Sequence, residues 1–355
     1  MSVPLDVWLD GAIGETRYAI ARAGRPIALV ITRWSDHGRR ARWGEIYVGR
    51  VRKVERALGG AFVDLGLRGE QGFLPRDAGG QIEGREAREG EAVCVRIARE
   101  GARGKGPVLA GLGAAPAGAE IGRTGRREED AAHDDAAPAD AATRAALDAA
   151  IEEALAVDAP LPGGGFLRIE TTAALTAIDV DAAGRKDAGD REGFARALNI
   201  EAAAEAMRHL RLRAQGGLAA IDFVSMRRPE NRKAVESALR EAARGDPWGP
   251  VFAPMSRFGV VELTRAQYML PVRETLLDSA GRKSAETVAL EGLRALEREA
   301  AHAHGRKLIA RAPQGALDWL ESDAIAWRAP LSARIGARWE IVAGPPGARV
   351  DVQVT

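Results

Sequence analysis

The chain has 355 residues, of which 46% are hydrophobic and 28% are charged, and its formal net charge is +1 at neutral pH. This composition is typical of a globular protein with a sizeable core, and the length predicts two or three compact units. The single cysteine, Cys94, excludes internal disulfides and multi-cysteine zinc sites within this sequence. The sequence has no run of 18 apolar residues and no signal-peptide pattern, so we expect a cytoplasmic protein with no membrane partner.

Residues 1–37 contain short runs in which apolar and polar positions alternate, and Gly24 and Pro26 mark the turns. This pattern predicts an antiparallel hairpin. Five further β segments follow at regular spacing, and they predict a barrel of the OB type. Their aromatic residues, Tyr47, Phe62 and Phe73, are either barrel core or a surface on which RNA bases stack. The five expected strands are 46–54, 61–65, 72–74, 92–97 and 108–112.

A glycine-rich basic turn at residues 99–106 contains Arg103 and Lys105. These side chains either contact phosphate or lie solvated at a hairpin tip. The region 38–106 has 15 basic and 10 acidic residues, a modest excess that suits phosphate contacts. Residues 113–143 are rich in Ala, Asp, Gly and Pro, which predicts a flexible linker before a helix at 145–156.

Two short apolar segments, 175–181 and 218–226, each carry an aspartate and are joined by a helix expected at 195–214. We expect Asp179 and Asp222 to be buried, which costs several kcal/mol unless something positive compensates the charge. A Mg²⁺ ion with oxygen ligands is one such compensation. Backbone hydrogen bonds at a strand end are the other, and the spacing alone does not decide between them.

The remaining chain alternates helices and strands, which predicts an α/β layered domain and a multidomain fold of the α+β or α/β class. On the helix at 195–214 we expect three arginines to face outward, as a solvated face or as RNA contacts. They are Arg208, Arg211 and Arg213. The later expected elements are a helix at 231–244, a strand pair within 251–263, a helix at 284–299 and apolar segments at 308–310, 316–321, 339–342 and 350–354.

Several of these segments resemble, in order, the bacterial ribonuclease E/G family. The central motifs are LTAIDVD (175–181), NIEAA (199–203), LRLR (210–213), GG (216–217) and IDF (221–223). The resemblance continues through SRFGVVELTR (256–265) and extends back to LPGGGF (161–166) and GEIYVGRV (44–51). It therefore covers most of the chain.

The resemblance implies an S1 RNA-binding domain of the OB type inserted in a ribonuclease-H-like subdomain, then a DNase-I-like α/β catalytic domain. A small C-terminal α/β domain would follow and mediate homodimer contacts. The implied bounds are 1–37 and 144–174 for the ribonuclease-H-like subdomain, 38–112 for S1, 113–143 for the linker, 175–280 for the catalytic domain and 281–355 for the C-terminal domain.

The resemblance also implies roles for single residues. The residues that match Asp179 and Asp222 hold the catalytic Mg²⁺, and Asp181 stands where the family has an assisting asparagine. In an extended strand Asp181 shares a face with Asp179, so it either acts as a third ligand or repels the RNA phosphate and slows the enzyme. In the barrel, the implied RNA contacts are Tyr47, Phe62 and Phe73 for stacking, and Arg103 and Lys105 for phosphate.

The sequence departs from the family at two places. Residues 272–289 contain no cysteine where the family has its zinc link, so we expect no zinc-linked assembly. The insertion that forms a pocket for a 5′-monophosphate is missing after the barrel, and Gly249 stands where an arginine completes that pocket. We therefore expect 5′-end sensing to be lost.

Together these features predict a Mg²⁺-dependent endoribonuclease that cleaves single-stranded RNA in RNA processing or decay. The alternative is an RNA-binding relative with weak or no catalytic activity. A third possibility is a structural protein that docks on a larger ribonuclease or ribosomal assembly.

Overall fold

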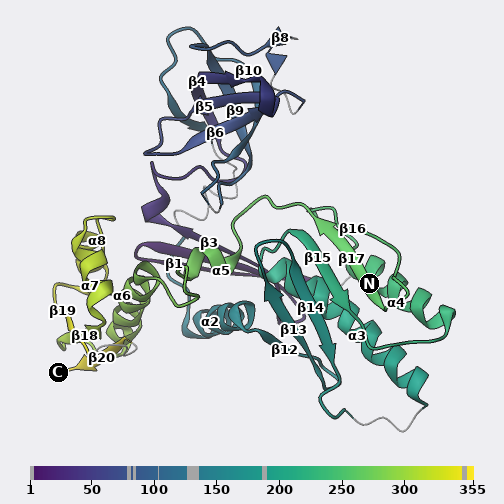
Figure 1. Cartoon of the computed structure of the whole chain (residues 1–355). Coiled ribbons are helices and arrows are strands. Elements are labelled where there is room, and N and C mark those ends of the chain that lie inside the picture. Colours follow the sequence, from purple (N-terminus) through teal and green to yellow (C-terminus); the bar gives the residue numbers. More distant parts are fainter. Residues whose placement is uncertain are drawn as a thin grey trace. The chain divides into compact units, whose positions relative to one another are not determined.

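The computed structural model describes residues 4–77, 81–82, 85–102, 104–125, 136–185, 190–345 and 350–355. The chain forms two compact units, each built from segments that are distant in the sequence (Figure 1). One unit comprises Met1–Val7, Ala19–Val30 and Leu147–Arg273. The other comprises Trp8–Tyr18, Ile31–Ala146 and Glu274–Thr355. No helix among the described residues is long and apolar enough to cross a membrane.

The N-terminal segment forms a three-stranded sheet in the order β1-β2-β3, so the predicted hairpin gains one strand. Its strands are β1 (Leu5–Ala12), β2 (Glu15–Arg22) and β3 (Arg25–Arg33), and the 3-10 turn η1 (Trp34–Asp36) follows. Glu15 is fully buried and forms ion pairs with Arg17, Arg33 and Arg294 at 2.7–2.9 Å. Burial alone would raise the pKa of Glu15, but the three guanidinium groups outweigh it and lower that pKa. Glu15 is therefore ionised and ties this sheet to helix α6 (Ala285–His302).

The predicted barrel is confirmed as a closed five-stranded barrel. Its strand order is β4-β5-β6-β10-β9, and β9 pairs back with β4 to close it. Strand β10 lies parallel to β6, and the other pairs are antiparallel. The strands are β4 (Ile46–Glu55), β5 (Gly60–Asp64), β6 (Gln71–Pro75), β9 (Ala92–Arg99) and β10 (Val108–Ala114), with the 3-10 turn η2 (Arg56–Leu58) and the short pair β7 (Gln81–Ile82) and β8 (Arg85–Glu86).

Two secondary-structure elements lie wholly or partly inside the predicted linker at 113–143. Strand β11 (Gly122–Gly125) pairs with the start of β4, because β5 pairs only with residues 50–55 of β4 and leaves this edge open. Helix α2 (Ala141–Leu155) begins inside the predicted linker, four residues earlier than expected. Residues 126–135 of the expected linker lie outside the described residues.

A six-stranded sheet carries both aspartates of the central motif, in the order β12-β13-β14-β15-β17-β16. Strands β14 and β15 are parallel and are joined by helix α3, the crossover expected between parallel strands. Helices α3 and α4 pack their apolar residues on one face of the sheet (Figure 1). The elements are β12 (Asp158–Pro160), β13 (Phe166–Thr171), β14 (Thr176–Asp181), α3 (Arg191–Leu212), β15 (Gly217–Asp222), α4 (Pro229–Ala242), β16 (Val251–Phe252) and β17 (Val260–Arg265).

Two expectations about this region are corrected. Strand β13 pairs with β14 along six residue pairs, so the domain boundary expected between residues 174 and 175 divides one sheet. The three arginines of α3 do not face solvent. Arg208 is 6% exposed and bonded to Glu205, while Arg211 and Arg213 donate to the backbone carbonyls of Ala242 and Ala156. The helix is therefore covered on more than one side, which its apolar pattern did not indicate.

The C-terminal segment forms a three-stranded sheet, β19-β18-β20, packed against α6, α7 and α8. Strand β18 is parallel to β19 and antiparallel to β20. The elements are α5 (Val272–Leu276), α6, β18 (Leu308–Ala312), α7 (Gln314–Glu321), α8 (Arg328–Ile335), β19 (Trp339–Ala343) and β20 (Asp351–Val354).

Candidate functional site

Asp179 and Asp222 are direct neighbours across two parallel strands. They form one register pair, and the preceding pair joins Ile178 to Ile221. Their Cα atoms are thus separated by the spacing of adjacent strands, about 5 Å. Both isoleucines are buried and both aspartates are exposed, so the two carboxylates leave the same open face at the carboxyl ends of β14 and β15. Sheets with parallel strands commonly bind ligands at this edge.

The expectation that these aspartates are buried is wrong. Strand β14 alternates strictly, and Ile178 and Val180 enter the core while Asp179 and Asp181 point to the open face. The desolvation argument for a cation therefore no longer applies. A different argument for a cation remains. The two adjacent carboxylates repel each other, and a bound cation with oxygen ligands would relieve that repulsion.

Asp181 lies on the same face but is engaged locally. Its Oδ1 accepts a hydrogen bond of 2.7 Å from the backbone N–H of Ala183, and its register partner is Phe166 on β13. No group of three His, Cys, Asp or Glu residues suited to a metal is present in the part of the chain that the structure describes. The second oxygen, Oδ2, is not used in this hydrogen bond, so both roles considered for Asp181 stay predictions.

Asn199 fixes the chain just beyond Asp222. This side chain lies on α3 with 0% exposure. Its Nδ2 donates to the carbonyl of Val224 at 2.8 Å, and its Oδ1 accepts from the N–H of Val224 at 3.1 Å. An amide is the side chain that satisfies both backbone groups at once, because it carries a donor and an acceptor. Asn199 thereby positions the strand end that carries Asp222.

Arg168 is a basic residue of the strand that neighbours the aspartate pair. It is the register partner of Asp179 on β13 and lies on the open face. Its guanidinium donates to both carboxylate oxygens of Asp158 at 3.0 and 3.3 Å, and that hydrogen bonding lowers the pKa of Asp158. The sequence analysis missed Arg168, although the alternation of residues 166–171 would have placed it on this face.

The glycines of the motif at 161–166 allow a close approach to β14. A Cβ at Gly165 would lie 2.6 Å from the carbonyl oxygen of Asp181, and one at Gly163 would lie 2.8 Å from the guanidinium of Arg185. Gly165 also has a φ of +84°. A side chain at Gly165 would push this loop away from the strand end, whereas one at Gly163 would require only the Arg185 side chain to move.

In the barrel, Phe62 and Phe73 form a cross-strand pair on the outside. They are register partners on β5 and β6, and their ring centroids are 5.4 Å apart at 60°. Both are partly exposed, whereas Val63 and Leu74, the residues next to them, are buried in the core. This pair has the exposure and geometry of a stacking surface.

Tyr47 does not belong to that surface, and the expectation that it stacks bases is corrected. It is 3% exposed and packs in the barrel core, and its hydroxyl donates to Glu45 at 2.9 Å. Burial and the neighbouring Glu45 carboxylate raise the pKa of Tyr47, which keeps the hydroxyl protonated. Residues 47–49 are all buried, so this part of β4 shows no alternation that could reveal the inward side.

The basic turn lies beside the strand of Phe73. Backbone bonds of 3.0 Å in both directions join Ala102 and Lys105, and the side chain of Lys105 is exposed. The N–H of Phe73 donates to the carbonyl of Pro107 at 2.8 Å, which ties the turn to β6. Arg103 lies outside the described residues.

Comparison with known proteins gives a family match for part of the chain. Residues 126–268 match the model of the Ribonuclease E/G family, a range that contains Asp179, Asp181, Asn199 and Asp222. Over this range the chain is similar to the ribonuclease E/G family. The resemblance found in the sequence is thereby confirmed.

Individual relatives each match less than half of the chain. Ribonuclease E of Escherichia coli (strain K12) is 37% identical over 174 residues, which are 47% of this chain and 16% of that protein. Ribonuclease E of Haemophilus influenzae is 37% identical over 161 residues, 43% of this chain and 17% of the relative. Ribonuclease G of Salmonella typhimurium is 32% identical over 155 residues, 42% of this chain and 32% of the relative. The match thus spans a third or less of each of these relatives.

Proposed function

We propose that this protein is a Mg²⁺-dependent endoribonuclease that cleaves single-stranded RNA. The observation that carries the proposal is the register pair Asp179 and Asp222 on the open face of a segment that is similar to the ribonuclease E/G family. Two exposed carboxylates suit Mg²⁺, which prefers oxygen ligands and keeps several waters. When bound, the ion would polarise a phosphate oxygen and lower the pKa of an attacking water.

The chain's own residues would position the reacting groups. Arg168, next to Asp179, is placed to contact the phosphate backbone of RNA once its pairing with Asp158 is exchanged. Asn199 would hold the strand end under Asp222. Asp181 adds a negative charge on the same face, which opposes an RNA phosphate, so we expect a slow enzyme.

We assign RNA binding to the barrel, as an S1-type domain. Phe62 and Phe73 would stack bases, a contribution of about 1–3 kcal/mol per base, and Lys105 would contact phosphate. In the same proposal the six-stranded sheet is the DNase-I-like catalytic domain and the N-terminal sheet is part of a ribonuclease-H-like subdomain. The absence of zinc linkage, the loss of 5′-monophosphate sensing, a homodimer and a cytoplasmic location remain predictions.

The second candidate is an RNA-binding relative that does not cleave. It is favoured by Asp181, which replaces the amide expected there and adds a further negative charge to the open face.

A cleavage assay separates the two candidates. Fluorescent single-stranded RNA with a 5′-hydroxyl or a 5′-monophosphate would be incubated over tenfold steps of Mg²⁺ with wild type, Asp179→Ala and Asp222→Ala. Cutting by wild type that needs Mg²⁺, ignores the 5′ end and disappears in both variants supports the endoribonuclease. Binding of RNA by wild type without cutting at any Mg²⁺ concentration contradicts it and leaves the second candidate.

A further inference from the structure

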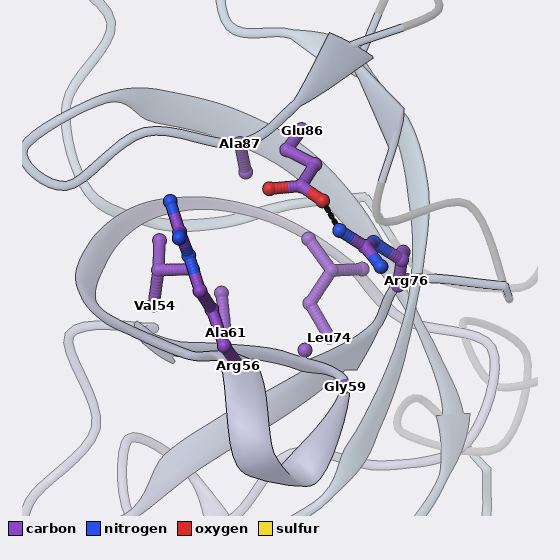
Figure 2. A pocket seen from close by; sticks show the side chains of 9 residues that line it. Val54, Arg56, Gly59, Ala61, Leu74, Arg76, Glu86 and Ala87 are labelled. Atoms are coloured by element: carbon purple, nitrogen blue, oxygen red, sulfur yellow. Dashed lines mark ion pairs between the residues drawn. The ribbon is translucent and has the colours of Figure 1, made fainter.

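The barrel contains a pocket at the turn between β4 and β5, with a volume of about 430 Å³ (Figure 2). Its floor is apolar and consists of Val54, Ala61, Leu74 and Ala87. Two cationic side chains, Arg56 on η2 and Arg76 after β6, stand at opposite sides of the opening in Figure 2. An apolar floor under a charged rim suits a ligand with one flat apolar part and one anionic part.

The pocket adjoins the Phe62 and Phe73 pair. Gly60 lines the pocket, and a Cβ added there would lie 2.5 Å from Cζ of Phe73, so the glycine backbone touches that ring. Leu74, in the pocket floor, follows Phe73 directly on β6. The N–H of Arg76 donates to the carbonyl of Gly59 at 2.9 Å, which holds the two sides of the opening together. A nucleotide in this pocket would therefore be adjacent in the strand to a base stacked on Phe73.

The charges at the opening favour one phosphate. Arg76 forms an ion pair with Glu86, whereas Arg56 forms none with the other side chains drawn in Figure 2. The guanidinium of Arg56 is thus available to an anion. The hollow next to this pocket shares Val54, Arg56, Glu86 and Ala87 with it and adds Glu55, Arg88 and Glu89. A second phosphate there would meet two further carboxylates against one further guanidinium. The pocket therefore fits a single nucleotide, and the carboxylates of the neighbouring hollow disfavour a bound strand that extends into it.

We propose that this pocket binds one nucleotide of single-stranded RNA, with its base on the apolar floor and its phosphate at Arg56. The inference rests on the proposed RNA binding and extends it from the aromatic pair to a defined neighbouring site. The edge of the base would meet the ion pair of Arg76 and Glu86, which offers both donors and acceptors.

The test measures fluorescence anisotropy of the full chain with labelled hexanucleotides in EDTA, which prevents Mg²⁺-dependent cutting. The probes are one intact hexanucleotide and a series with an abasic residue at each position in turn. The variants are Arg56→Ala, Ala87→Leu to fill the floor, and Phe73→Ala for the stacking surface. Arg52→Ala is the matched control, because Arg52 is an exposed arginine of the same barrel that pairs with Asp64 and does not line the pocket.

We expect Arg56→Ala to weaken binding of the intact probe about tenfold, the effect of losing one charge-assisted contact, and Arg52→Ala to change it less than about twofold. In wild type, an abasic residue at the position bound in the pocket should weaken binding. In Arg56→Ala and Ala87→Leu, an abasic residue at that position should cause no further loss of affinity. In Phe73→Ala, the position that causes no further loss should be the neighbouring one. Circular dichroism melting would show that each variant is folded, and the exposed Arg56 allows the test even if Ala87→Leu does not fold.

If wild type binds RNA and Arg56→Ala weakens binding no more than Arg52→Ala does, the proposed pocket site is contradicted and the proposed RNA binding is not. Absence of RNA binding by wild type overturns the pocket together with the proposed RNA binding, whereas normal binding without cutting affects only the nuclease proposal. Arg76→Ala provides a second variant at the same opening, and a loss of less than about twofold from both arginines also contradicts the inference.

Discussion

In both the barrel and the six-stranded sheet, alternation along each strand decides which side chains face outward. The two regions differ in how clearly residue type indicates the outward side. In the sheet, helices α3 and α4 cover one face, and the charged residues Asp179 and Asp222 identify the open face. In the barrel, Tyr47 and Phe62 are both aromatic, and only the structure shows that one is core and the other is surface. In the sheet, strand alternation together with charge marks the open face, whereas in the barrel the exposed face depends on which way each ring points.

The comparison also separates two tasks. The barrel is proposed to supply affinity for RNA, and the sheet is proposed to supply the chemistry. If that division is correct, substitutions in the sheet should lower the rate of cutting and leave RNA affinity unchanged. Substitutions in the barrel should weaken RNA affinity and leave the rate of cutting unchanged.

The largest effect is expected for Asp179→Ala. Loss of one metal-holding carboxylate should lower kcat by at least about 10²–10³-fold, as for removal of other groups that stabilise a transition state. RNA affinity measured by anisotropy in EDTA should stay within about twofold. The matched control is Glu262→Gln. Glu262 lies on β17, where it pairs in register with Ala220, and its exposed carboxylate is on the same open face of the sheet as Asp179. An equal loss in the control would contradict a specific role for Asp179.

A smaller loss is expected for Asn199→Asp. The new carboxylate cannot donate to the carbonyl of Val224, so the strand end under Asp222 loses one of its two bonds. We expect kcat to fall by about 10- to 100-fold and the Mg²⁺ concentration for half-maximal rate to rise, the usual outcome when a group that orients a ligand is lost. Unchanged Mg²⁺ dependence together with a lower melting temperature would instead indicate a purely structural role.

Changes in the barrel should act on binding. Phe62→Ala and Phe73→Ala should each weaken RNA binding by about 1–3 kcal/mol, seen as a higher KM with kcat unchanged. Tyr47→Phe is the control. It removes only the hydroxyl that donates to Glu45, so it should lower stability and leave RNA affinity intact. A loss of affinity in Tyr47→Phe equal to that in Phe62→Ala would abolish the distinction between core and surface rings.

The smallest effect is expected for Arg168→Ala. Its guanidinium is half exposed and shared with Asp158, so its removal should lower kcat/KM about two- to fivefold. The loss should shrink at high salt, because exposed charges are screened. Cleavage rates of both proteins at two ionic strengths would show this, and a loss that is independent of salt would contradict a phosphate contact.

The sequence predicted the five barrel strands because glycine turns separate short alternating runs. It also singled out Asp179 and Asp222 as candidate metal ligands, because their motif is specific, and that role stays a prediction. The register of Asp179 with Asp222 depends on the parallel pairing of β14 with β15, which no local pattern encodes. Strand β11 was missed because its sequence, GRTG, has no strand pattern and pairs only with the free edge of β4. Arg168 was missed for a related reason, since its meaning comes from its partner across β13 and β14.

The most direct test of the account is a double-mutant cycle on the aspartate pair, with RNA cleavage rates measured at saturating Mg²⁺ for wild type, Asp179→Ala, Asp222→Ala and the double variant. If both carboxylates hold one ion, each single change removes its action and the double variant is no slower than either single variant. If the two losses multiply, the residues act independently and the shared ion is excluded. If wild type binds RNA and never cuts it, the catalytic role of the pair is contradicted.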